Sequence, residues 1–134
     1  MQETRGRDRR DNAATQNYSN NLAVLMAGFL GGMAHAHPAL ETAVPAQGAT
    51  VSPPKEIRLT FTEDLVAKFS GLTVKDQSGR LVETASPTVD PNQKGQLIVP
   101  ISKPLQPGTY DVDWHAVSAD THKVSGRFSF KVAQ

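Results

Sequence analysis

The sequence predicts an all-β domain, namely an antiparallel sandwich or barrel of about seven short strands. Three observations support this fold class. Apolar and polar residues alternate with a period of two in several short runs. Proline- and glycine-rich turns separate these runs at intervals of about 8 to 12 residues, as in β-sandwiches. No proline-free window of about twelve residues carries the apolar stripe of an amphipathic helix.

The first half of the expected domain holds one strongly patterned strand. Residues 39–44 precede a turn and are expected to open the sheet. In segment 57–61, apolar residues alternate with charged or hydroxyl residues, which is typical of a half-buried strand. Segment 63–70 lacks this alternation and is expected to form a loop or a short helical turn. Segments 72–74 and 81–82 are short apolar runs and weaker strand predictions.

The second half is patterned more clearly. Segment 97–101 is a short apolar run, whereas segments 110–116 and 128–132 alternate strictly between apolar and polar residues. Trp114 lies in the first of these alternating strands and is expected to be the central aromatic residue of the core. His115 then faces solvent, which favours a surface residue over a metal ligand.

The first 36 residues resemble an export signal. Residues 22–34 form an uncharged apolar run of 13 residues, which is shorter than the about 20 residues needed to span a bilayer. Ala34 and Ala36 supply the small residues required for cleavage after Ala36. The alternatives are a retained anchor or a buried helix. Cleavage would leave residues 37–134, that is 98 residues in one exported domain.

The composition of residues 37–134 excludes several functions. Ten Lys and Arg residues balance ten Asp and Glu residues, so no long-range field attracts nucleic acid or an anionic membrane. The chain has no cysteine, which excludes disulfides and thiolate chemistry. All three methionines precede residue 37, so the remaining chain offers no sulfur ligand for Cu(I).

Cleavage after Ala36 would make His37 the first residue. Its α-amine and imidazole Nδ1 could then close a six-membered chelate ring on a metal ion. Pro38 has no amide hydrogen, so the next peptide nitrogen cannot become a third ligand. The other ligands must come from elsewhere in the fold.

A second pair of donors lies in Asp120-Thr121-His122. In an extended segment, residues two apart project to the same side, so Asp120 and His122 could face one ion. Together with His37 they offer three nitrogens and one oxygen, a set typical of Cu(II). Zinc would accept these donors but prefers a tetrahedron, and nickel binds such sites more weakly than Cu(II).

Each of these motifs also has a simpler interpretation. Asp120 to His122 could form a plain turn between two strands, and an exposed chain terminus is usually disordered. Glu63 and Asp64 follow a predicted strand and could lie in a solvated loop. Alternatively, one of them accepts a hydrogen bond from the amine of His37 and orients it.

The chain resembles the CopC copper-resistance family across segment 37–134. The resemblance rests on the initial histidine, the Pro-Gly-Thr-Tyr to Trp strand, and the Asp-x-His motif. The similar segments are 37–40, 45–49, 59–63, 107–114 and 117–122.

The resemblance implies a periplasmic Cu(II)-binding protein with a seven-stranded Greek-key fold, similar to Ig-like and cupredoxin-like sandwiches. It also implies that His37, Asp120 and His122 bind one Cu(II) per chain. Glu63 would correspond to the acidic residue beside the terminal amine, which favours it over Asp64. An inner-membrane CopD-type copper protein is the implied partner. Some relatives carry a methionine-rich Cu(I) loop, but segment 91–96 has no methionine, which indicates a Cu(II)-only site.

The leading functional hypothesis is a monomeric copper carrier or buffer without enzymatic activity. The first alternative is a monooxygenase of the lytic polysaccharide type, which also binds copper through an N-terminal histidine. The chain has few aromatic residues for a polysaccharide surface and a carboxylate among its predicted ligands. The second alternative is a metal-free Ig-like interaction module.

Overall fold

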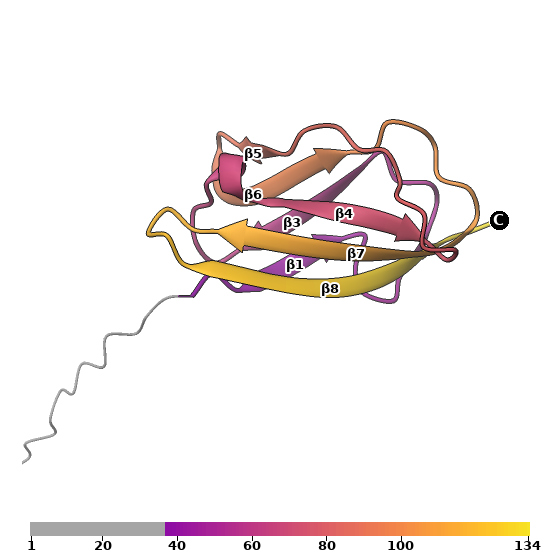
Figure 1. Cartoon of the computed structure of the whole chain (residues 1–134), viewed down its shortest axis with the longest axis horizontal. Helices are drawn as coiled ribbons and strands as arrows, with labels where there is room; N and C mark the ends of the chain where they lie inside the picture. The colour runs from indigo at the N-terminus through magenta and orange to yellow at the C-terminus, as the bar shows by residue number, and fades with distance from the viewer. Residues whose placement is uncertain (1–36) are drawn as a thin grey trace, which may run out of the picture. The chain divides into compact units, whose positions relative to one another are not determined.

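Residues 37–134 form two β-sheets that pack face to face in a computed structural model, which describes this part of the chain (Figure 1). The two separate four-stranded sheets confirm the predicted sandwich rather than a closed barrel. The predicted signal peptide, residues 1–36, lies outside the described residues. The elements are β1 (Leu40–Val44), β2 (Thr50–Val51), β3 (Glu56–Phe61), η1 (Ala67–Phe69), β4 (Gly71–Asp76), β5 (Thr88–Asp90), β6 (Gln93–Pro100), β7 (Gly108–Val117) and β8 (Lys123–Val132).

One sheet has the order β1-β3-β6-β5, and the other has the order β2-β8-β7-β4. Neighbouring strands are antiparallel except for β2 and β8, which pair in parallel. The longest ladder joins β7 to β8 and runs without a break from Gly108↔Val132 to Val117↔Lys123. The continuous pairing of β7 with β8 fixes the position of the turn that joins them, residues 118–122.

The observed strands differ from the predicted ones at three places. Segment 81–82 makes only an isolated bridge, in which Leu81 pairs with Lys75. The strands β2 and β5 were not predicted, because β2 has two residues and β5 lies between prolines that indicated a turn. Segment 63–70 contains the predicted helical turn as η1. Within residues 37–134, no helix is long and apolar enough to cross a membrane.

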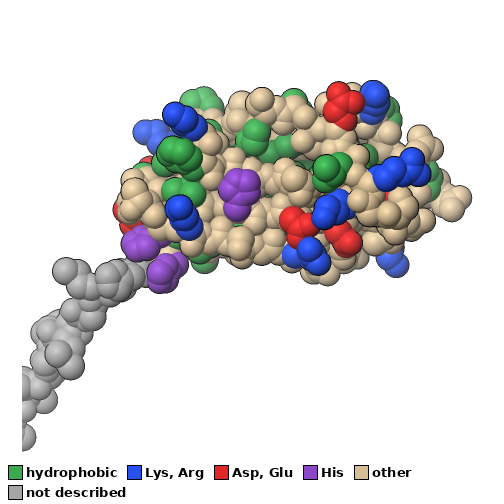
Figure 2. Space-filling model, in the orientation of Figure 1, with side chains coloured by type: hydrophobic (Ala, Val, Ile, Leu, Met, Phe, Trp, Pro, Cys, Tyr) green, Lys and Arg blue, Asp and Glu red, His purple; other side chains and the backbone are tan. Residues whose placement is uncertain are grey.

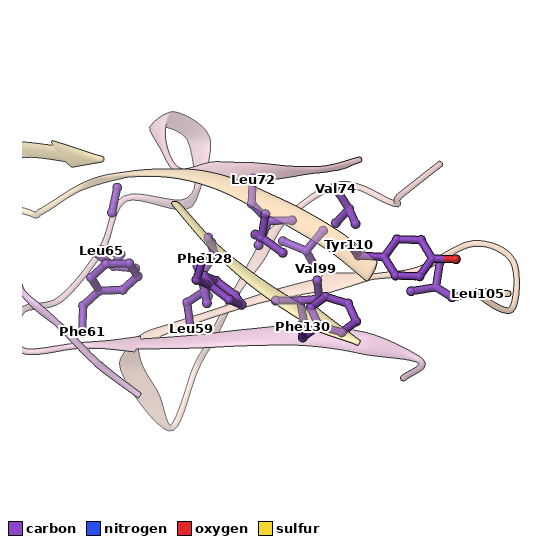
Figure 3. Packing of buried hydrophobic residues seen from close by; sticks show 14 of the residues in the cluster. Leu59, Phe61, Leu65, Leu72, Val74, Val99, Leu105, Tyr110, Phe128 and Phe130 are labelled. Carbon is purple, nitrogen blue, oxygen red and sulfur yellow. The ribbon is translucent and has the colours of Figure 1, made fainter. Parts of the chain in front are cut away.

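Alternation along the strands produces the core. Ile57 and Leu59 are fully buried and Phe61 is 3% exposed, as the period-two pattern predicts. Burying each such side chain contributes about 1.5 to 3 kcal/mol. Figure 3 shows the core extending from Phe61 at one end to Tyr110 at the other.

Trp114 is not the central core residue that the sequence predicted. It is only partly buried and packs against the core from its margin. Its indole contacts Phe61 edge to face, with 5.2 Å between ring centroids. Its ladder partner is Gly126, and a Cβ atom there would lie 2.5 Å from the indole. The large indole is therefore accommodated beside a residue without a side chain.

The cross-strand pair Asp113 and Arg127 lies on the outer face of β7 and β8, and its removal should change the acid stability. The hydrogen bond from Arg127 lowers the pKa of Asp113. A lowered pKa stabilises the fold above the unfolded-state value, and this contribution is lost as the pH falls through the folded-state value. We expect R127Q to lower the Tm slightly at neutral pH and to flatten its decline in acid. Thermal melts from neutral to acidic pH would test this, and parallel curves for both proteins would contradict it.

Candidate metal centre

Three segments meet at the end of the sandwich where the described chain begins (Figure 1). They are the start of the described chain, the loop that follows β3, and the turn between β7 and β8. The first segment is anchored by Pro38, which is buried, while His37 next to it is exposed. The backbone N–H of Ala39 donates to Oγ1 of Thr62 at 3.0 Å, and that of Thr62 donates to the Ala39 carbonyl at 2.9 Å. His37 therefore projects from a fixed base beside the end of β3.

The turn between β7 and β8 brings Asp120 and His122 together. Thr121 adopts a left-handed backbone conformation with φ of 72°, which is uncommon for a residue other than glycine. Nδ1 of His122 lies 3.1 Å from Oδ2 of Asp120. These residues do not form the extended segment that was predicted from the sequence. The alternative of a turn is what the structure shows, and this turn pairs the two side chains.

Ser118 connects both members of this pair. Its role was not predicted from the sequence. Its side chain is almost fully buried at 1% exposure. The hydroxyl donates a short hydrogen bond to Oδ1 of Asp120 and accepts one from the backbone N–H of His122 at 3.2 Å. A serine two residues before an aspartate has no distinctive sequence pattern, and its role becomes visible only through its burial.

The Ser118 hydroxyl also favours the ionised form of Asp120. The hydrogen bond from Ser118 contributes most to lowering the pKa of Asp120, and the neighbouring His122 lowers this pKa further. Asp120 therefore stays ionised in mild acid and keeps its negative charge beside the imidazole. The 3.1 Å contact places Nδ1 of His122, rather than Nε2, beside the carboxylate of Asp120.

The structure places His37 next to His122. The two ring centroids lie 5.0 Å apart with an interplanar angle of 72°. Within residues 37–134, however, no three His, Asp or Glu side chains already surround a single point that could hold a metal. Closing the predicted set therefore requires a side-chain movement, which the solvent exposure of His37 allows.

Glu63 lies near Asp120, one of the predicted ligands. It lines a hollow of about 280 Å³ together with Asp64, Asp120 and two neighbouring residues. Glu63 is partly buried and Asp64 is exposed. The backbone carbonyl of Asp64 accepts a hydrogen bond from the N–H of Ala119 at 2.9 Å, which ties the two loops together. Both Glu63 and Asp64 therefore lie on the loop that borders Asp120.

His115 is exposed on the outer face of β7, as the alternation predicts. It pairs with Gly71 on β4 and Ser125 on β8. It is not among the three segments that meet at the site.

The chain belongs to the CopC family, since the model of the CopC domain matches residues 40–133. It is 40% identical over 124 residues to "Copper resistance protein C" of Escherichia coli, covering 84% of this chain and 96% of that protein. It is 38% identical over 130 residues to the protein of the same name from Pseudomonas syringae pv. tomato, covering 87% and 97%.

Solved structures agree with this assignment. PcoC, a methionine-rich copper resistance protein from Escherichia coli, superposes with a TM-score of 0.65 at 36% identity, covering 72% of this chain and 99% of that chain. CopC from Methylosinus trichosporium OB3b superposes with a TM-score of 0.67 at 26% identity, covering 72% and 94%. The matched region thus spans nearly the whole length of both solved chains.

A further relative carries the domain inside a longer chain. "Copper transport protein CutJ" of Bacillus subtilis is 26% identical over 114 residues, which cover 84% of this chain but only 21% of that protein. The sandwich thus occurs both as nearly a whole protein and as one part of a larger copper transport protein.

Proposed function

We propose that this protein binds one Cu(II) ion outside the cytoplasm and stores or delivers it, as part of copper resistance. The ligands are the amine and imidazole of His37, the carboxylate of Asp120 and the imidazole of His122, with Glu63 orienting the amine. One observation carries the proposal: in a member of the CopC family, the ring of His37 lies against the ring of His122, which in turn contacts Asp120.

The donor set favours Cu(II) over Cu(I). Nitrogen and oxygen ligands suit Cu(II), whereas thioether and thiolate sulfur suit Cu(I). Residues 37–134 contain neither cysteine nor methionine, in contrast to the methionine-rich PcoC. The protein is therefore proposed to handle copper in its oxidised state.

Export through cleavage after Ala36 is part of this proposal, because only cleavage frees the amine of His37. The protein acts as a monomeric carrier without catalytic turnover. Its proposed partner is an inner-membrane copper protein of the CopD type. The occurrence of the domain within a larger copper transport protein supports a partner that this chain meets as a separate molecule.

Replacement of His122 tests the proposed ligands. Protein that begins at His37 is expected to take up one equivalent of Cu(II), with nitrogen hyperfine structure in its electron paramagnetic resonance spectrum. H122A should weaken binding by more than about 100-fold, since loss of groups that merely orient a ligand already costs about 10- to 100-fold. H115A is the matched control, because His115 is exposed and is not among the proposed ligands. Similar losses in both variants would argue against the assignment.

Ser118 should affect copper binding without touching the metal. In S118A, the carboxylate of Asp120 and the backbone N–H of His122 both lose their shared partner. We expect an affinity loss of about 10-fold or more and a destabilisation of about 1 to 3 kcal/mol. S125A, on the exposed face of β8, is the control. Chelator competition and denaturant unfolding would measure the two effects, and unchanged affinity would contradict the role of Ser118.

A further inference from the structure

An apolar groove lies beside the proposed copper site. It has a volume of about 450 Å³, and its lining includes Phe69, His115, Val117, Thr121 and Lys123. Figure 2 shows apolar and basic side chains at the end of the molecule where histidine side chains lie, although basic side chains are present at the opposite end as well. The groove is separate from the hollow that Glu63 and Asp120 share.

Phe69 gives the groove an exposed aromatic wall. It is 56% exposed and belongs to η1, none of whose residues is buried. The core therefore does not require its ring. Exposed aromatic side chains at the edge of an apolar groove are typical of sites that bind another molecule.

The groove also carries a local positive charge. Lys123 lines it, and Nζ of Lys68 lies 5.7 Å from the centre of the Phe69 ring. Neither lysine forms an ion pair with another of the residues 37–134. The lining includes no carboxylate, so both ammonium groups are available to carboxylates of a partner.

The groove and the proposed copper site share the turn between β7 and β8. Thr121, which lines the groove, stands between Asp120 and His122. A molecule seated in the groove would therefore contact the turn that positions both of these residues.

We propose that this groove is a docking surface for a protein segment that presents an apolar side chain flanked by carboxylates. The inference rests on the proposed function only in taking that segment to belong to a protein that exchanges copper with this chain. A concave apolar lining suits an inserted side chain. An anionic membrane is a poorer fit, because the charges of residues 37–134 balance at ten of each sign.

Peptide titration of the copper-free protein tests the docking surface. The probe is a short capped peptide, Glu-Glu-Phe-Leu-Glu-Glu, added at millimolar concentration to isotope-labelled protein beginning at His37. We expect nuclear magnetic resonance shifts confined to the groove, notably at the amides of Phe69, Thr121 and Lys123. A peptide with lysine in place of each glutamate should cause no such shifts, since like charges then meet.

Two variants and two matched controls sharpen this test. F69S and K68E are each expected to weaken peptide binding about tenfold or more, through lost apolar contact and reversed charge. L81S removes another exposed apolar side chain, which is 68% exposed, and K131E reverses an exposed charge on β8. Both controls should bind the peptide like the unaltered protein.

Several results would overturn the docking proposal. One such result is resonance shifts at residues outside the groove. Another is equal binding of the acidic and basic peptides, and a third is weaker peptide binding by the controls L81S and K131E. Binding to vesicles of anionic lipid through Phe69, without binding of the peptide, would identify a membrane surface instead and would also overturn it. Because the titration uses no copper, it can fail while Cu(II) binding at His37 holds, and the reverse outcome is equally distinguishable.

Discussion

Protein with one glycine added ahead of His37 is expected to bind Cu(II) more than about 100-fold more weakly than protein that begins at His37. The extra peptide bond converts the amine into an amide, which removes one nitrogen donor and opens the chelate ring. Pro38 prevents compensation, because its peptide nitrogen carries no hydrogen and cannot be deprotonated to bind the metal. Competition against a chelator of known affinity would measure the difference.

The matched control places the added glycine after Gln134 instead. That end of the chain lies at the opposite end of the sandwich from His37 (Figure 1), so copper affinity should not change. All three proteins should melt at the same temperature, because His37 is exposed and contributes little to the core. Equal copper affinity in the two N-terminal forms would exclude the amine as a ligand.

The parts of the fold that follow a strict period of two were predictable. In β3, alternation reflects one buried and one partly buried face, and the structure buries Ile57, Leu59 and Phe61 accordingly. β2 and β5 were not predictable, since runs of two and three residues carry no periodicity. Their pairing depends on the partner strands β8 and β6, which supply the tertiary context.

The residues of the candidate site were predictable from donor chemistry, but their geometry was not. His37 and the Asp120–His122 pair follow from the kinds of atom that Cu(II) accepts. The contact between Asp120 and His122 depends on the left-handed conformation of Thr121 and on the buried hydroxyl of Ser118. Neither feature has a sequence pattern, because both depend on how the hairpin turn packs against the loop that follows β3.

That loop is held in place by close backbone packing. The N–H of Leu65 donates to the carbonyl of Lys94 at 2.9 Å, which joins the loop to β6. Next to Lys94, Gly95 is buried, and its α-carbon faces the backbone of Phe61 and Glu63. The lack of a side chain at this position therefore lets β6 approach the chain that leads to the proposed copper site.

Alanine at position 95 is expected to damage both the fold and the site. Its Cβ would lie 2.6 Å from the carbonyl oxygen of Phe61 and 3.1 Å from that of Glu63. Both atoms belong to the main chain, so the contact cannot be relieved by rotating a side chain. We expect G95A to lose about 1 to 3 kcal/mol of unfolding free energy and to bind Cu(II) more weakly, because the displaced loop carries Thr62, the anchor of the His37 segment.

Gly71 offers a matched control for this substitution. It is also buried in a strand, but a Cβ there would meet Cε1 of His115 at 3.3 Å, and that exposed imidazole can turn away. G71A should therefore cost less stability than G95A and leave copper affinity unchanged, since His115 lies outside the site. Denaturant unfolding and copper competition on both variants would separate the two contacts. Equal stability losses in the two variants would show that the backbone contact at Gly95 relaxes easily. Unchanged copper affinity in G95A would show that β6 does not position the loop that follows β3 and anchors the His37 segment.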